Sequence, residues 1–331
     1  MKVQLLTVEE DEAELRLDRW FKQHFPGLGH GRLEKLLRTG QVRVDGRRAK
    51  AGVRLQAGQQ VRVPPSAATD ASQAARQGRR PAAPADERAT AWLRDAVLFR
   101  DDWVIALNKP AGLAVQGGSG QTRHLDAMLE ALQFEAAERP RLVHRLDKDT
   151  SGILLLARNR RAAQALTEAF RDGAVRKTYW AAVAGVPRPA RGRIDLPIGK
   201  QAGAAREKMA GDPHGTKALT EYVVAGASKG EAAWLALRPI TGRTHQLRVH
   251  CALIGHPILG DGKYGGKAAF LRGRPEIKQL QLHAREIAVP HPADGTTLRV
   301  VAPLPEHMER AWADFGFDRA KGQSRSDSLD N

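Results

Sequence analysis

The stretch LVHRLDKDTSGILLLAR, residues 142 to 158, joins a charged loop to an apolar strand. Asp147 and Asp149 flank a lysine, and Arg145 lies two residues before Asp147. A carboxylate in a loop beside a buried strand, with cations within reach, can stay ionised where water is excluded. The segment therefore suggests a functional carboxylate. It can equally be read as a surface turn whose Ser and Thr hydroxyls bond their own backbone.

The chain around this stretch mixes strands and helices without a regular alternation of the two. Short turns separate several of the expected strands, which are VIALNKP, GILLLAR, KTYWAAVAG, LTEYVVAG, AAWLALRPI and LRVVAP. Helices are expected at residues 160–170 and 245–253. Adjacent strands with short connections favour an α+β fold, with a mixed and largely antiparallel sheet.

The composition of residues 64–90 predicts a linker, because Pro, Ala, Ser, Gln and charged residues dominate there. With 331 residues the chain has room for two domains. We therefore expect a small N-terminal module at residues 1–65, a flexible linker at 66–90 and a main body at 91–318. The polar residues 319–331 are expected to form a disordered tail.

The module is predicted to consist of two helices followed by a β-ribbon. Apolar residues recur at helical spacing from Leu17 to Phe25 and again from Leu33 to Leu37, before Gly40 ends the second helix. The strands QVRVDG and QQVRVP follow. Between residues 31 and 63 there are nine basic residues and two acidic ones; the basic residues include Arg32, Lys35, Arg38, Arg43, Arg47 and Arg48. They form either a solvated basic face or an RNA-binding surface.

The net charge of +16 favours a polyanionic partner, and nucleic acid more than a membrane. The chain has no run of about 18 apolar residues that could span a bilayer. Its N-terminus, MKVQLLTVEEDE, is not typical of a secretory signal or transit peptide. Because Cys251 is the single cysteine, an internal disulfide and a cysteine-rich zinc site are excluded. We expect a cytoplasmic protein.

Two further segments carry reactive side chains. In PITGRTHQLRVHCALIGHPILGD, residues 239 to 261, Arg243 and Arg248 bracket the first turn of a helix that begins near His245. Such arginines can hold a carboxylate or a phosphate. The histidines lack the i, i+4 pair of a metalloprotease helix, so no metal is expected. In RKTYWAAVAG, Tyr179 is either a core residue or a phenol that faces a pocket and stacks on a base.

Other motifs give weaker evidence of function. Gly117, Gly118 and Gly120 suggest a phosphate loop, but no Lys-Ser or Lys-Thr follows them, so a flexible turn is expected. The Gly-Xaa-Ser-Xaa-Gly elbow of serine hydrolases is missing from the sequence.

Taken together, these segments resemble the family of bacterial ribosomal large-subunit pseudouridine synthases. The resemblance runs from Leu15 to about Pro305, and VHRLDKDTSG is its most specific part. The motifs LNKPAGLAVQGGSG, KTYWAAVAG, PITGRTHQLRVHCALIGHPILGD, LHA and HP accompany it. The N-terminal segment is similar to the alpha-L RNA-binding motif, also named for ribosomal protein S-four. With AVQGGSG, it resembles the type-C branch of the family.

The resemblance implies roles for individual residues. Asp147 matches the catalytic carboxylate, Tyr179 the active-site tyrosine, and Arg248 the arginine that pairs with that carboxylate. Arg145 matches an arginine thought to help hold a flipped nucleotide, and Arg243 and His245 are further RNA-binding candidates. The sequence departs from the family at Arg285 and Glu286, so the resemblance does not predict which residues form the edge of the pocket.

The implied reaction breaks the N-glycosidic bond of uridine, rotates the uracil and rejoins it through carbon-5. Nothing is oxidised and no group is imported, so no cofactor and no metal are expected. The implied partner is large-subunit (23S) ribosomal RNA, bound by a monomer. Two other functions remain open: a non-catalytic RNA-binding factor in ribosome assembly, and another RNA-modifying enzyme such as a methyltransferase. The missing glycine-rich cofactor loop is evidence against the methyltransferase.

Overall fold

The computed structural model describes residues 3–25, 27–67, 87–117, 123–201 and 208–329. The chain divides into two compact units, residues 1–84 and 85–331. Residues 68–86, which make up most of the expected linker, lie outside the described residues. The expected linker extends too far at its C-terminal end, because residues 87–90 already belong to helix α4 (Glu87–Asp95).

The first unit has its own apolar core. Helices α1 (Leu17–His24) and α2 (His30–Arg38) bury the leucines and aromatic residues expected from the spacing. Strands β1 (Gln4–Thr7), β4 (Gln60–Val63), β2 (Arg43–Val44) and β3 (Arg47–Arg48) lie in this order in an antiparallel sheet. The prediction of two helices and a ribbon is confirmed, with β1 and the short helix η1 (Glu10–Glu12) in addition.

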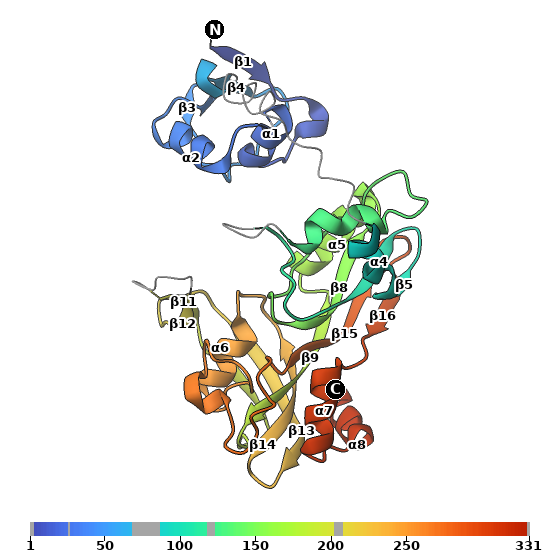
Figure 1. The fold of residues 1–331 in the computed structure, drawn as a ribbon. Helices are drawn as coiled ribbons and strands as arrows, with labels where there is room; N and C mark the ends of the chain where they lie inside the picture. Colours follow the sequence, from blue (N-terminus) through green and yellow to red (C-terminus); the bar gives the residue numbers. More distant parts are fainter. Residues whose placement is uncertain (1–2, 26, 68–86, 118–122, 202–207, 330–331) are drawn as a thin grey trace. The chain divides into compact units, whose positions relative to one another are not determined.

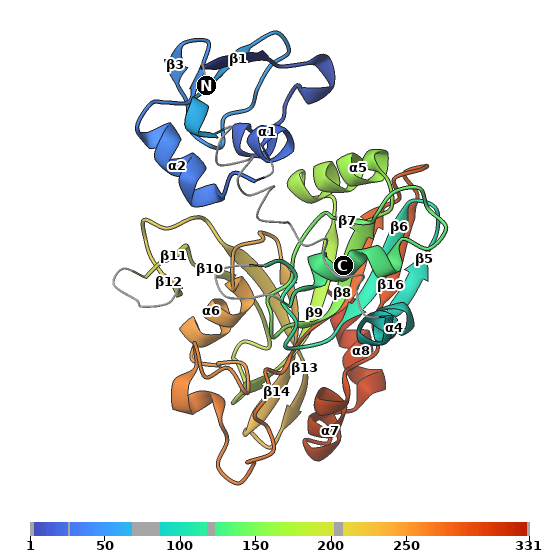
Figure 2. The same cartoon turned by 45° about the horizontal axis from the view of Figure 1, so that its top comes forward.

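The second unit is built on one ten-stranded sheet (Figures 1 and 2). The main path runs β10, β13, β14, β9, β15, β8, β6, β5, with β16 beside β15 and β7 beside β8. The bounds are β5 Val97–Arg100, β6 Val104–Lys109, β7 Arg141–Leu142, β8 Ser151–Ala157, β9 Arg176–Ala184, β10 Arg191–Asp195, β13 Leu219–Ser228, β14 Ala232–Pro239, β15 Leu282–Pro290 and β16 Thr297–Val301.

Every neighbouring pair in this sheet is antiparallel except β15 with β8. The α+β class and the largely antiparallel mixed sheet are therefore confirmed. A separate pair, β11 (Ile198–Lys200) and β12 (Met209–Gly211), completes the strands of the described residues.

Helices cover both faces of the sheet. On the half that holds β6 and β8, η2 (Leu125–Leu132) and α4 pack on one face, and α5 (Arg160–Arg171) packs on the other. On the other half, α6 (Gln246–Leu253) packs on one face, and α7 (Glu306–Asp314) packs on the other. The short helix η3 (Gly266–Ala269) follows α6 in the chain.

The prediction of a disordered tail is wrong. Residues Arg319–Asp327 form helix α8, which packs against β13 and β14 (Figure 1). The helix has no apolar stripe, and it docks through small residues instead. Gly322 lies against the ring of Trp234, and Trp180 donates a hydrogen bond to Ser326 over 3.1 Å. Residues of this kind allow close contact but give no hydrophobic pattern in the sequence.

We predict that Gly322→Ala destabilises the second unit. A β-carbon at this position would overlap the ring of Trp234, which is itself enclosed by Trp180 and Trp312. We expect the free energy of unfolding to fall by about 1–3 kcal/mol, as for other overpacked sites. Chemical denaturation measures this. The matched control is Ser324→Ala on the exposed side of α8, which should have little effect. Equal stability of the two variants would contradict the docking of α8.

Candidate active site

The loop that carries Asp147 is held in place by Lys109, which lies at the end of β6. The Lys109 side chain is fully buried, and its ammonium donates hydrogen bonds to the carbonyl oxygens of Pro110, Leu113 and Lys148 at 2.8, 2.9 and 3.0 Å. Burial lowers the pKa of Lys109 to about 8, although the charges of Asp149 and Asp147 act in the opposite direction. The lysine of the LNKP motif is therefore an anchor of the loop, a role that the sequence did not indicate.

A close backbone contact fixes the other end of the loop. Gly152 has φ +107°, and a β-carbon there would overlap the backbone of Ala284. This approach belongs to the single parallel pairing of the sheet, in which His283 lies opposite Ser151 and Ala284 opposite Gly152. The glycine of the TSG turn is therefore required for β8 to join β15 directly after the loop.

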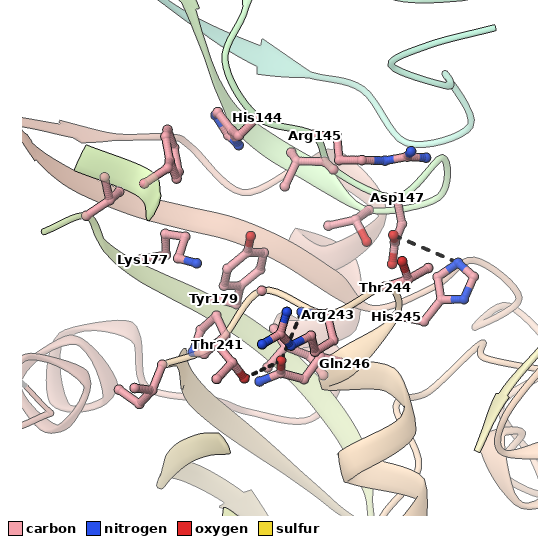
Figure 3. A pocket seen from close by; sticks show the side chains of 18 of the residues that line it. His144, Arg145, Asp147, Lys177, Tyr179, Thr241, Arg243, Thr244, His245 and Gln246 are labelled. Carbon is pink, nitrogen blue, oxygen red and sulfur yellow. Dashed lines mark hydrogen bonds and ion pairs between the residues drawn. The ribbon is translucent and has the colours of Figure 1, made fainter. Parts of the chain in front are cut away.

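The loop forms one wall of a pocket of about 570 Å³ (Figure 3). The candidates expected from the sequence meet here, although they come from distant parts of the chain: the pocket is lined by Arg145, Asp147, Tyr179, Arg243, His245 and Arg248. Asp149 is exposed and is not among the lining residues. The geometry thus separates the two carboxylates of the DKD sequence, and Asp147 is the one that faces the pocket.

The expected pair between Arg248 and Asp147 is not formed. Arg248 instead makes a buried two-point contact with Asp261, with Nε–Oδ2 and Nη2–Oδ1 distances of 2.8 and 2.7 Å. Burial acts to lower the pKa of Arg248, but the bonds and the charge of Asp261, with a contribution from Asp147, raise it above its usual value. Arg248 lies in the first turns of α6, where its side chain reaches the GD sequence at residues 260–261. The sequence alone did not single out Asp261.

Among the ion pairs of the described residues, the one that involves Asp147 is formed with His245. The Nε2–Oδ1 distance is 3.8 Å, and the other ring nitrogen, Nδ1, lies 2.6 Å from the hydroxyl of Tyr264. Burial lowers the pKa of His245, while the charge of Asp147 acts to raise it. In the neutral tautomer whose Nδ1 accepts a hydrogen bond from the Tyr264 hydroxyl, the Nε2 proton points toward Asp147.

The backbone of His245 adds a second observation. It adopts φ 56° and ψ 18°, a left-handed conformation that residues other than glycine seldom adopt. Strain of this kind is concentrated at functional sites. The structure thus places His245 beside the carboxylate, and Tyr264 is a partner that the sequence did not reveal.

Tyr179 lies on β9 and lines the pocket, so it is not a simple core residue. Burial raises the pKa of its hydroxyl, and the nearby charge of Asp147 raises it further. The phenol is therefore held in its protonated form at neutral pH. In that form the hydroxyl can donate a hydrogen bond or relay a proton, but it is a poor resting base.

The two remaining pocket arginines lie at its rim. Arg145 is exposed beside the carboxylate loop. Arg243 is also exposed, and its Nε donates a hydrogen bond to the carbonyl oxygen of Lys217 over 3.1 Å. Both positions suit contacts to an anionic ligand that enters from solvent.

The six basic residues singled out in the first unit are exposed: Arg32, Lys35, Arg38, Arg43, Arg47 and Arg48. Along α2, Arg32, Lys35 and Arg38 face solvent, while the intervening leucines are buried. Arg43 donates to the carbonyl oxygens of Gly40 and Gly46, so part of its side chain supports the turn. Arg47 and Arg48 form the neighbouring strand β3. These residues form a basic surface of the module.

Arg285 and Glu286 do not line the pocket, so the expected uncertainty at its edge does not arise from them. The Arg285 guanidinium lies 4.3 Å from the centre of the Trp180 ring. Glu286 accepts two hydrogen bonds from Arg299, at 2.6 and 2.9 Å. Both residues therefore serve the packing of β15 against its neighbours.

Within the described ranges, no cluster of three or more His, Cys, Asp or Glu side chains is arranged to hold a metal ion. No helix in that part of the chain is long and apolar enough to cross a membrane. Cys251 is buried, which raises the pKa of its thiol to about 12. Of the glycine-rich turn, Gly118 and Gly120 lie outside the described residues.

Comparison with known proteins connects this pocket to a family. The family model described as RNA pseudouridylate synthase matches residues 103–253, a range that contains Asp147, Tyr179, His245 and Arg248. The chain is 35% identical to ribosomal large subunit pseudouridine synthase C of Escherichia coli, over 93% of this chain and 95% of that protein. It is 36% identical to the protein of the same name from Vibrio cholerae, over 94% and 96% of the two chains.

A solved structure agrees with the sequence matches. Human RNA pseudouridylate synthase domain containing 4 superposes with a TM-score of 0.58 at 29% identity, covering 70% of this chain and 97% of that one. Identity above 30% over almost the full length of both chains, together with the shared fold, shows the relationship. The chain belongs to the RNA pseudouridylate synthase family, and it is an RNA pseudouridine synthase.

Proposed function

We propose that this protein converts uridines of large-subunit ribosomal RNA to pseudouridine, with Asp147 as the catalytic carboxylate and without a cofactor. The substrate is suggested by the names of its relatives from Escherichia coli and Vibrio cholerae. The proposed role of Asp147 rests on its position, because it is the one acidic side chain among the residues that line the pocket.

Asp147 has the surroundings that a reacting carboxylate needs. Its side chain is 22% exposed, so a ligand can reach it, and Nε2 of His245 lies 3.8 Å from its Oδ1. The arginine behind it is already neutralised by Asp261. This arrangement leaves the Asp147 oxygens available to attack the ribose or to remove a ribose proton, the two routes open to a carboxylate in this reaction.

Tyr179 and Arg145 complete the proposed site. The Tyr179 ring can stack on the uracil, and its protonated hydroxyl can relay the proton that carbon-5 loses. Arg145 at the rim can hold the backbone of the nucleotide once it has left the RNA stack, a step that costs a few kcal/mol. In this proposal the basic module contributes RNA affinity that offsets this cost.

One assay distinguishes the proposed enzyme from a non-catalytic ribosome-assembly factor. The purified protein is incubated with unmodified 23S ribosomal RNA in the presence of a metal chelator and without any added cofactor, and pseudouridines are then mapped. New pseudouridines at defined positions support the proposal. RNA binding without any pseudouridine would contradict it.

We predict that Asp147→Asn abolishes pseudouridine formation but leaves the fold and RNA affinity nearly unchanged. The amide keeps the size of the side chain, but it can neither attack the ribose nor accept its proton. Removal of a reacting group of this kind costs a factor of about 10,000 or more in rate. The matched control is Asp149→Asn, which should retain most activity because Asp149 is exposed outside the pocket. The reverse result would move the catalytic role to Asp149.

We predict that Tyr179→Phe slows single-turnover conversion more than it weakens RNA binding. The ring still stacks, but the hydroxyl near Asp147 is lost. Groups that relay protons typically contribute about 100- to 10,000-fold in rate. Rates are measured with saturating protein, and affinity is measured separately by filter binding. A variant as fast as the wild type would show that the hydroxyl takes no part.

We predict that removal of residues 1–65 leaves a folded second unit that modifies long structured RNA poorly. The two units have separate apolar cores, so the second one keeps its packing. Each lost phosphate contact lowers the slope of log affinity against log salt by about 0.7–0.9, so three to five contacts flatten it by about two to four units. Affinity and turnover are compared for both proteins across a salt series. An unchanged slope and unchanged turnover would mean that the module does not bind this RNA.

A further inference from the structure

Lys177 shares the pocket with Tyr179 but has no part in the site as described so far. The two residues stand two positions apart on β9, so their side chains project from the same face of the strand. The close-up view shows Tyr179 between Lys177 and Asp147 (Figure 3). Lys177 therefore lies on the far side of the tyrosine from the carboxylate.

The ammonium of Lys177 is unusual in its lack of protein partners. Among the described residues, none lies within hydrogen-bond or ion-pair distance of it. Burial lowers the pKa of Lys177, and no carboxylate counters that effect. The contrast with Lys109 is clear, because Lys109 donates to three carbonyl oxygens and is stabilised by two nearby aspartates. A cation withdrawn from water without a partner costs free energy. Such a cation is suited to a ligand that supplies negative charge.

Two other cations that line the pocket are already paired with carboxylates. Arg248 is bound to Asp261, and Arg171 at the end of α5 is bound to Asp172. Lys177 is thus a half-buried cation whose charge is not neutralised within the described part of the protein. It therefore provides a positive potential at the end of the pocket beyond Tyr179.

The proposed reaction generates negative charge on the uracil, and the inference that follows rests on the proposed function. When the bond between N1 of uracil and C1′ of the ribose breaks, its electron pair stays on N1 and spreads to the oxygens O2 and O4. We propose that the ammonium of Lys177 stabilises this detached uracil anion. No proton is transferred from Lys177. The negative charge on the base disappears when carbon-5 attacks C1′ and Asp147 is released as the free carboxylate. Carbon-5 then loses its proton while N1 takes one up, so the base ends neutral.

The position of Lys177 favours the base over a backbone phosphate. Asp147 must reach the ribose, and the uracil extends away from the ribose past the ring of Tyr179. The end of the pocket that holds Lys177 then faces the oxygens of the base. Arg145 and Arg243 lie at the rim, where the phosphates of an entering RNA strand pass. A fixed charge aimed at developing charge in a water-poor site is a strong catalytic contribution.

The test compares Lys177→Met, which keeps the length of the side chain and removes its charge, with Lys177→Arg, which keeps the charge. Lys278→Met is the matched control, because Lys278 is exposed and does not line the pocket. The probe is unmodified 23S ribosomal RNA, and the measurements are single-turnover rate, affinity across a salt series, and thermal unfolding. Lys177→Gln serves as a second neutral variant if Lys177→Met does not fold.

We expect Lys177→Met to lower the rate by about 100- to 1,000-fold, the range found when one charge-stabilising donor is removed. Affinity and its salt slope should stay unchanged, and Lys177→Arg should recover much of the rate. The unfolding temperature of Lys177→Met should not fall, because a charge without a protein partner has been removed. A near-normal rate in the neutral variant overturns the proposal. So does weaker binding with a salt slope smaller by about 0.7–0.9, which would identify a phosphate contact. A wild-type protein that makes no pseudouridine would refute the proposed function instead.

Discussion

The site depends on a buried ammonium group. Lys109 ends β6 and donates to the carbonyl oxygens of Pro110, Leu113 and Lys148, and the last of these belongs to the loop of Asp147. Three hydrogen bonds replace the water that the cation has lost, so the lysine can be buried without a direct ion pair. The carboxylate loop is thereby tied to the central sheet, and the position of Asp147 follows from that attachment.

The rest of the site is assembled on this fixed loop by the order of the strands. The parallel contact between β8 and β15 places the loop close to β9, which carries Tyr179. The helix α6 brings His245 and Arg248 to the other side of the pocket. Because Asp261 neutralises Arg248, the positive charge behind the pocket is balanced, and Arg248 forms no ion pair with Asp147. In the proposed mechanism, the carboxylate is then available to react with the ribose.

Much of this arrangement could be predicted from local patterns. Apolar runs identified six strands of the sheet, and helical spacing identified both helices of the first unit. Helices were also expected where α5 and α6 lie. The resemblance to the synthase family assigned Asp147, Tyr179 and Arg248 to one active site, and all three line the pocket. Patterns of this kind are visible because periodicity and turn residues act over short distances in the chain.

What could not be predicted depends on contacts between distant residues. The partner of Arg248 is Asp261, and the partner of His245 is Tyr264; neither has a signature of its own in the sequence. Helix α8 was missed because Gly322 and Ser326 hold it through close contact and one hydrogen bond rather than an apolar stripe. In each case the fold determines the role of a residue whose type alone is ambiguous.

The alternation of side chains along β9 limits how this enzyme can change. Lys177 and Tyr179 face the pocket, whereas Trp180 belongs to the aromatic core beneath α7 and α8. A deletion of one residue within the strand would turn the indole into the pocket and the phenol into the core, because a shift of one position exchanges the two faces. Point substitutions can adjust either face separately, but insertions and deletions here would damage catalysis and folding together.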